Sequence, residues 1–258
     1  MTDEARFRAL LGAALARVRT LAAADPLFVP NEEAAAFAAA DGPMPELIVV
    51  GDNPGAEELP RKEYLSGLGS AGRDARAFFD AALGQPGAVG SKVLVWNKST
   101  YHTPRTGGLS ALMRSGDQAL IARLCEDQAE NGCLLVRLAA ASRVPVLAIG
   151  LERDEMTFAA FRSSLEAEAD RLGVRHAVFR GMETSAFLKA PHFSTCKIFC
   201  HNTNAAWNAR LDAYLAEWAA KHPQLRTNNG NVSPAALMAL PGPAPQEAYL
   251  RQVILHGV

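Results

Sequence analysis

The stretch Leu47–Gly55, LIVVGDNPG, constrains the fold of this chain more than any other. Its four leading apolar residues, mostly β-branched, suit a strand covered on both faces, as in the parallel sheet of an α/β protein. In the turn that follows, Pro54 fixes its own φ and pushes Asn53 towards an extended conformation. Open α/β sheets bind ligands beyond the carboxyl ends of their strands, so this turn is the first candidate site. An ordinary strand-to-loop connection fits the stretch equally well.

Strand-like and helix-like segments alternate along the rest of the chain. Short apolar runs predict three further strands, at residues 92–96, 144–149 and 176–179. The spacing of apolar residues predicts helices at residues 2–24, 31–40, 70–83, 111–124, 128–141, 157–172 and 203–220. This alternation predicts an α/β fold, a three-layer α/β/α sandwich with a central, mainly parallel four-stranded sheet.

A length of 258 residues suits one large α/β domain, and no long linker divides the chain. We expect a single domain with N-terminal helices (1–45), a core (46–202) and a C-terminal helix and tail (203–258). The alanine-rich first helix is interrupted by Arg17 and Arg19 and has the layout of neither a membrane span nor a signal peptide. A cytoplasmic protein that does not contact a membrane is therefore the expectation.

Charge and cysteine usage narrow the classes of partner. The net charge is −1, whereas nucleic-acid binders often carry a basic excess, so any DNA-binding surface must be a local patch. The four cysteines, at positions 125, 133, 196 and 200, show no paired CxxC spacing. Cys196 and Cys200 with His201 have a spacing that can hold a metal on a helical turn, but free cysteines are more commonly buried small hydrophobes. We expect no metal site.

Polar groups follow the expected strands on the side where a ligand would bind. Asn97 ends the second strand as Asn53 ends the first, and a polar turn at 192–194 follows the last one. The loop over 57–72 is long for a connection, which favours a functional loop. The helix expected to begin near Ser70 would direct its N-terminus into the same crevice, where it could accept a phosphate.

Four motifs stand in order along the chain: Gly51-Asp52-Asn53-Pro54-Gly55 with an acidic pair after it, Ser70-Ala71-Gly72, Asn97 followed by Thr103-Pro104-Arg105, and His192-Phe193-Ser194. In order and spacing they resemble the uracil-DNA glycosylase superfamily, over about residues 47–202. The first is similar to the mismatch-specific and single-strand-selective branches, and the next two to the thermostable iron–sulfur branch. Tyr101 stands where that branch has a cluster cysteine, so no iron–sulfur cluster is expected. Phe193 replaces the proline usual in the last motif.

This resemblance implies a monomeric DNA glycosylase that hydrolyses the N-glycosidic bond of uracil or a related deaminated base, with no metal or organic cofactor. Its partner is DNA, from which the target base is flipped into a pocket. Cleavage leaves oxocarbenium-like charge on the sugar and negative charge on the base. The site therefore needs a placed water molecule and hydrogen-bond donors aimed at the departing base.

The resemblance also implies roles for individual residues. The proposed catalytic residues are Asn53, which would orient the attacking water, His192, which would stabilise the leaving anion, and Asp52, a second candidate activator. The base would be bound by Asn97 through its amide edge, by Tyr64 through stacking and by the pocket backbone at Gly51. The candidates for DNA phosphate contacts are Ser66, Ser70, Lys98, Arg105 and Ser194.

Three other interpretations stay open at this stage. Asn53 and Asn97 could simply cap turns, and His192 could be an ordinary surface histidine. The chain could be a catalytically diverged nucleic-acid- or nucleotide-binding protein of the same fold, which the near-neutral charge and Phe193 favour. It could also be an unrelated α/β enzyme that binds a small phosphorylated substrate at the helix start near Ser70.

Overall fold

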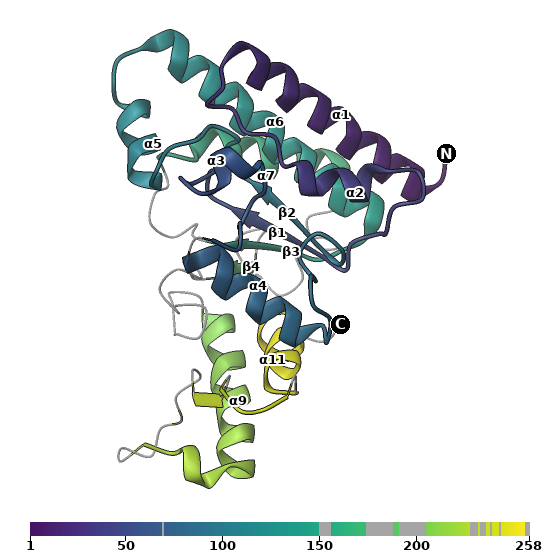
Figure 1. Ribbon diagram of the computed structural model, residues 1–258, viewed down its shortest axis with the longest axis vertical. Coiled ribbons are helices and arrows are strands. Elements are labelled where there is room, and N and C mark those ends of the chain that lie inside the picture. Colours follow the sequence, from purple (N-terminus) through teal and green to yellow (C-terminus); the bar gives the residue numbers. More distant parts are fainter. Residues whose placement is uncertain are drawn as a thin grey trace.

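The computed structural model describes residues 1–68, 70–149, 156–173, 188–190, 205–227, 232, 236–237, 239–242 and 244–255. Within these residues the chain is an α/β protein in which helices surround a small parallel sheet (Figure 1). The α/β class predicted from the sequence is therefore confirmed. In the same residues, no helix is both long enough and apolar enough to cross a membrane.

The sheet is built on β1 (Leu47–Gly51), which lies between β2 (Val93–Asn97) and β3 (Val146–Ile149). All of these pairings are parallel, and a short β4 (Leu188–Ala190) pairs with the outer edge of β3. The expected strand at 176–179 lies outside the described residues. The sequence analysis predicted no strand at residues 188–190, where β4 lies.

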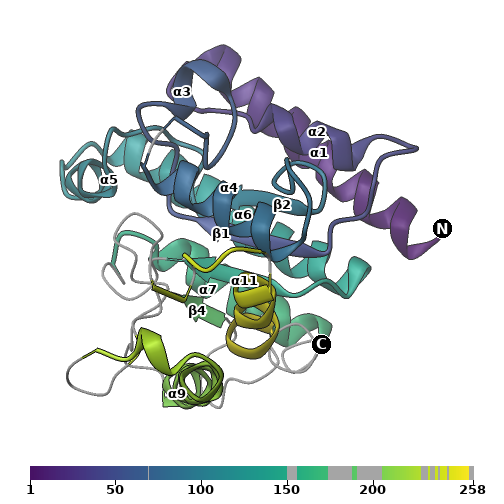
Figure 2. The same ribbon diagram turned by 60° about the horizontal axis from the view of Figure 1, so that its bottom comes forward.

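Helices cover both faces of this sheet because its side chains alternate between two buried clusters. Ile48, Val50 and Trp96 join the cluster formed with α1 (Asp3–Ala24), α6 (Gln118–Ser142) and α7 (Ala159–Leu172). Leu47, Val49 and Val95 join the cluster formed with α4 (Ser70–Ala82), α9 (Ala205–Lys221) and α11 (Ala244–Tyr249). Figure 1 shows α4 and α11 on the opposite side of the strands from α1, and in Figure 2 the side with α4 and α11 comes forward.

Several helix boundaries differ from the expected ones. The two helices expected at 111–124 and 128–141 are a short α5 (Thr106–Met113) and one continuous α6. No glycine or proline interrupts the chain at residues 125–127, so the polar residues there do not end the helix. Instead the break comes earlier, where the Asp117 carboxylate caps α6 by accepting a hydrogen bond from the Leu120 amide at 3.1 Å.

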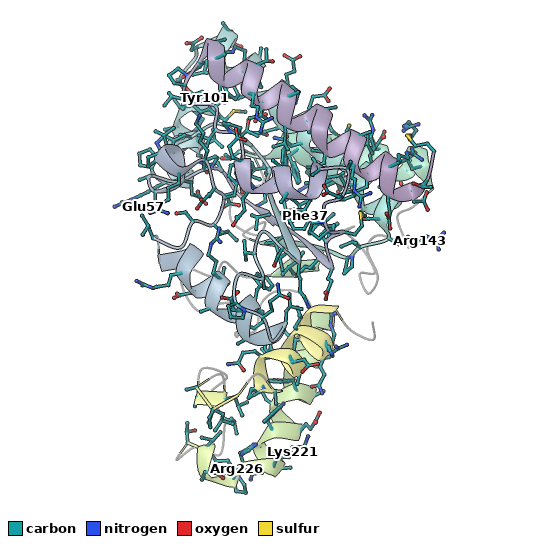
Figure 3. The ribbon with its side chains drawn as sticks, turned by 45° about the vertical axis from the view of Figure 1, so that its right-hand side comes forward. Phe37, Glu57, Tyr101, Arg143, Lys221 and Arg226 are labelled. Carbon is teal, nitrogen blue, oxygen red and sulfur yellow. The ribbon has the colours of Figure 1, made fainter. Side chains whose placement is uncertain are left out.

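Smaller elements complete the fold. The expected helix at 31–40 is a 3-10 turn, η1 (Glu32–Ala34), followed by α2 (Ala35–Ala38). The C-terminal tail contains η4 (Pro223–Leu225) and a π-helical segment η5 (Leu250–Leu255) after α11. A four-residue helix, α3 (Glu58–Arg61), follows the turn after β1. In Figure 3, Phe37 of α2 lies inside the molecule, whereas Glu57 before α3 lies at its outer edge.

Candidate functional site

The two strands that carry the candidate amides end side by side. Gly51 of β1 is the register partner of Asn97 of β2. Pairing continues beyond both strands, because the amide of Lys98 donates to the carbonyl of Gly51 at 3.0 Å and the amide of Ser99 donates to that of Asp52 at 3.1 Å. The sequence-based expectation that the motifs at 51–55 and 97 share one rim of the sheet is therefore met.

Asn53 is held in one orientation by a ring of acceptors. Its Nδ2 donates to Thr103 Oγ1 at 2.9 Å and to the Pro54 carbonyl at 3.2 Å, with the Tyr101 and Thr103 carbonyls at 3.4 Å. Thr103 Oγ1 itself donates to the Arg105 carbonyl at 2.7 Å, so it can only accept from Asn53. The amide nitrogen must therefore face this ring. Asn53 Oδ1 is left buried with no hydrogen-bond partner in the described structure.

Asn97 presents the complementary group. Its side chain is 3% exposed, and Nδ2 is buried with no hydrogen-bond partner among the described residues. The other end of the amide lies against Gly51, where an added Cβ would stand 2.5 Å from Asn97 Oδ1. Gly51 thus makes room for the amide of Asn97. A buried donor without a partner costs free energy, which a ligand that offers a carbonyl oxygen would recover.

Ser66 adds a third unpartnered group. It is 2% exposed, and its Oγ has no hydrogen-bond partner in the part of the chain that the structure describes. The loop that carries it packs directly on the start of α4, because a Cβ on Gly72 would come within 1.9 Å of the Ser66 carbonyl oxygen. Helix α4 begins at Ser70, as the sequence predicted.

Lys98 does not suit the predicted contact with DNA phosphate. Its side chain is fully buried and forms an ion pair with Asp52, and its Nζ lies 4.9 Å from the centre of the Phe158 ring. Burial lowers the pKa of Lys98, and the neighbouring Asp52 carboxylate opposes this shift. Because the ammonium group faces inward, the phosphate role assigned to Lys98 is wrong. The Asp52 carboxylate is engaged by Lys98, so Asp52 is a weaker candidate for water activation than Asn53.

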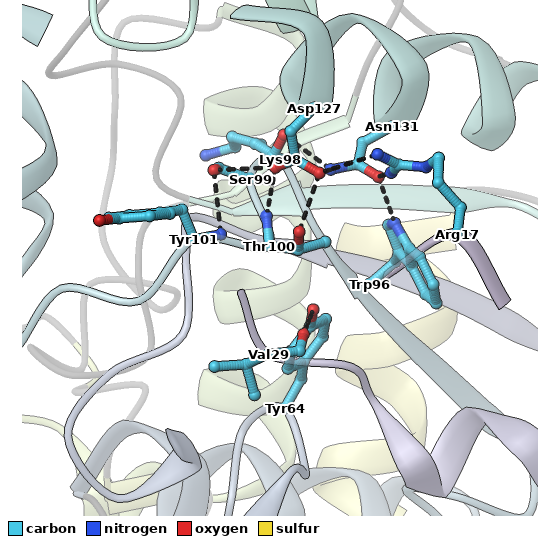
Figure 4. A network of polar contacts seen from close by, with 10 residues as sticks. All are labelled: Arg17, Val29, Tyr64, Trp96, Lys98, Ser99, Thr100, Tyr101, Asp127 and Asn131. Carbon is cyan, nitrogen blue, oxygen red and sulfur yellow. Dashed lines mark hydrogen bonds and ion pairs between the residues drawn. The ribbon is translucent and has the colours of Figure 1, made fainter. Parts of the chain in front are cut away.

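Tyr64 does not suit the predicted stacking on a base. Its ring is fully buried and packs edge-on against Trp96, with ring centres 6.1 Å apart. Its hydroxyl donates to the Val29 carbonyl at 2.6 Å (Figure 4), and burial raises the pKa of that phenol well above its usual range. The polar pattern of the loop gave no sign that this aromatic turns inward, and the stacking role is corrected accordingly.

A fully paired polar network holds the loop after β2 (Figure 4). The buried Asp127 carboxylate accepts from the Thr100 amide at 2.7 Å, from the Thr100 hydroxyl at 2.8 Å and from Ser99 Oγ at 3.1 Å. Arg17 donates to Asp127 at 3.2 Å and to Asn131 Oδ1 at 2.8 Å. The sequence analysis did not single out Asp127 and Asn131, although they stand four apart on a helix face that is mostly apolar.

The remaining predicted residues are distributed as follows. Arg105 is exposed beside Thr103 and caps the start of α5, so its guanidinium is accessible to a phosphate. His192 and Ser194, together with the Cys196, Cys200 and His201 group, lie outside the described residues. Among the described residues, no group of three or more histidine, cysteine or acidic side chains is arranged to hold a metal ion.

Comparison of the chain with protein-family models, with curated proteins and with solved structures finds no match. The functional argument therefore depends on the geometry of the strand ends and on the motifs themselves.

Proposed function

We propose that this protein is a DNA glycosylase that hydrolyses the N-glycosidic bond of uracil or a related deaminated base, on a three-layer α/β/α sandwich with a four-stranded sheet. One observation carries the proposal. At the ends of two neighbouring strands, a buried acceptor on Asn53 and a buried donor on Asn97 both lack partners among the described residues. Native proteins pair nearly all of their buried polar groups, so two unpartnered atoms at the ends of neighbouring strands are candidates for contact with a ligand.

The chemistry of the two groups fits this reaction. Asn53 Oδ1 would accept a hydrogen bond from the attacking water and orient it towards the sugar carbon, while the amide remains neutral and acts as a weak activator. Asn97 Nδ2 would donate to a carbonyl oxygen of the base and stabilise the negative charge that develops there. Cytosine presents an amino group at the same edge, so this donor would discriminate against it.

Other residues would serve DNA binding in this proposal. Arg105 would contact a backbone phosphate, and the hydroxyl of Ser66 would bind either the phosphate or the flipped nucleotide. His192 and Ser194 keep the roles implied by the resemblance, with His192 as a second donor to the leaving base. The net charge of −1 requires that such contacts be confined to a local patch, and binding should weaken with salt in proportion to the number of phosphates contacted.

Base release tests this function. Labelled oligonucleotides carrying uracil, hypoxanthine or xanthine, single-stranded and mispaired, are incubated with excess protein, using the wild type and Asn53→Ala. We expect release of one of these bases by the wild type, and a rate lower by roughly 100-fold in the variant. No release by folded wild-type protein, with DNA binding retained, would overturn the glycosylase proposal and favour a diverged nucleic-acid-binding protein.

A further inference from the structure

The carboxylate of Glu58, at the start of α3, joins the two loops that carry the unpartnered groups. One of its oxygens accepts a hydrogen bond from the amide of Gly55, which directly follows the Asn53-Pro54 turn. The other accepts from the amide of Leu65, and the amide of Ser66 also bonds to this carboxylate. The Glu58 side chain thus joins two segments: the turn that carries Asn53 and the loop that carries Ser66.

The loop on one side of this bridge adopts a backbone conformation that needs support. Leu65 has a φ of 48°, in the left-handed region that non-glycine residues rarely adopt. Its amide is held by Glu58, and its carbonyl accepts from Arg76 Nε at 2.7 Å. Arg76 is fixed in turn by two hydrogen bonds to Glu33, at 3.0 and 2.8 Å. Glu58 and Arg76 therefore hold both backbone polar groups of Leu65 by hydrogen bonds.

Only an ionised carboxylate can make all of these bonds well. It has acceptor sites on both oxygens, whereas a protonated acid or an amide presents a donor on one side. Burial raises the pKa of Glu58, and the backbone amides of Gly55, Leu65 and Ser66, together with the positive charge that His102 can carry, oppose that shift. Tyr64 also interacts electrostatically with Glu58.

The raised pKa of Glu58 means that its ionised form does not contribute to the stability of the fold. A carboxyl group with a raised pKa in the folded protein stabilises the fold most below its unfolded pKa, and this contribution is lost as the pH rises through the folded value. Ionised Glu58 therefore costs folding free energy near neutral pH. A partly buried charge retained at a cost to stability is typical of a residue kept for its site.

We propose that Glu58 is a positioning residue of this site, whose ionised carboxylate holds the 53–55 turn and the 64–66 loop together. Protonation places an O–H donor opposite one of the backbone amides that it binds and displaces that amide, which makes base release sensitive to acid. The effect on base release rests on the proposed function, whereas the effect on the two loops does not.

Amide hydrogen exchange tests, without any substrate, whether Glu58 holds the two loops. Protection factors of the Gly55, Leu65 and Ser66 amides are measured across pH 4 to 8, for the wild type, Glu58→Gln and the control Glu57→Gln. Glu57 is the adjacent exposed carboxylate, so its substitution should change nothing. We expect Glu58→Gln to lose roughly tenfold in protection at all three amides relative to the wild type. Unchanged protection at these amides in folded Glu58→Gln would overturn the proposal.

The pH profile of base release forms the second arm. We expect the rate of base release to decrease at acid pH in the wild type and in Glu57→Gln. In Glu58→Gln we expect a low rate at every pH, without this decrease. Suppose that base release is lost in Asn53→Ala but still decreases at acid pH in Glu58→Gln. That result would contradict the role of Glu58 and leave the glycosylase function intact. Exchange results as expected, with no base release by the wild type, would contradict the glycosylase function and leave Glu58 as the support of a binding site.

Discussion

Two polar clusters lie at the carboxyl end of the sheet, and they differ in how completely their groups are paired. Around Asp127, the carboxylate, the amide of Asn131 and the indole of Trp96 all have partners within hydrogen-bond distance (Figure 4). Around the turn after β1, one polar atom of Asn53 and one of Asn97 lack a partner among the described residues. Both clusters are buried and begin at adjacent strand ends, so burial alone does not distinguish them.

The difference indicates which cluster serves the fold and which serves a ligand. A buried network in which every group is satisfied stabilises one conformation of the chain. A buried amide that is fixed at one end and free at the other costs stability, and only an external partner offsets that cost. Asn53 shows the second pattern clearly, because four acceptors hold its nitrogen while its oxygen remains free.

Removing the centre of the paired cluster should have the largest effect. Asp127→Ala leaves the Thr100 amide and hydroxyl without their acceptor and leaves Arg17 with Asn131 alone, so we expect the free energy of unfolding to fall by about 3 kcal/mol. Urea denaturation followed by circular dichroism measures this change. Glu126→Ala, on the exposed neighbouring position of the same helix, is the control and should stay within about 0.5 kcal/mol of the wild type. Equal stability of the two variants would mean that the network is not structural.

Removing an unpartnered amide should change stability little and base release strongly. Asn97→Ala deletes a buried donor that no described group satisfies, so we expect a change in unfolding free energy below about 1 kcal/mol. Base release should fall by roughly 100-fold, because one donor to the leaving base is lost. The same denaturation series and a single-turnover assay measure the two quantities. A large loss of stability would show that Asn97 is a structural residue.

Displacing that amide without removing it should give a smaller effect. The Cβ of Gly51→Ala would stand 2.5 Å from Asn97 Oδ1, so the side chain must move away from its present position. We expect base release to fall by about tenfold at the least, since a displacement near 1 Å at a reacting site is costly. Gly12→Ala, where a Cβ would meet no atom within 4 Å, is the control and should retain full activity. Full activity in Gly51→Ala would show that base release does not depend on the position of the Asn97 amide.

A paired carboxylate far from the rim should respond to pH in the ordinary way. Arg171 and Arg137 donate to Glu168, at 2.6 Å in each case, and lower its pKa to about 2. A lowered pKa stabilises the fold above the unfolded value and loses that effect as the pH falls towards 2. Glu168→Gln should therefore cost about 1 kcal/mol at neutral pH, since its arginine partners are partly exposed. This difference in unfolding free energy should disappear near pH 2; a constant difference would contradict it.

The sequence predicts the backbone of the site better than its side chains. The apolar run at 47–50 and the strand-ending Asn97 place two strands on one rim, because parallel strands end on the same side. Side-chain direction in the long loop cannot be read from polarity. Tyr64 is polar enough for a surface position but turns inward to bond Val29, and Lys98 turns inward because Asp52 compensates its charge. Tertiary partners far along the chain decide both cases.

Helix α6 illustrates the same limit. Asp127 and its neighbours read as a break between two helices, because a polar stretch usually marks a solvent-exposed connection. Here the polar side chain is paired with Arg17 and with the loop after β2, so the helix runs through it. Glu58 was visible only as one of an acidic pair, since the three backbone amides that bond to it come from two separate segments.

The side-chain amide signal of Asn97 gives the most direct test of the unpartnered cluster as a base-binding site. It is followed by NMR while Asn53→Ala protein, in which we expect base release to be slow, is titrated with single-stranded oligonucleotides that differ only in one uracil or cytosine. We expect the Asn97 signal to shift with the uracil strand and not with the cytosine strand, and the paired Asn131 amide to stay in place with both. An Asn97 signal that ignores both strands, or that shifts equally with both, would contradict base recognition by this amide.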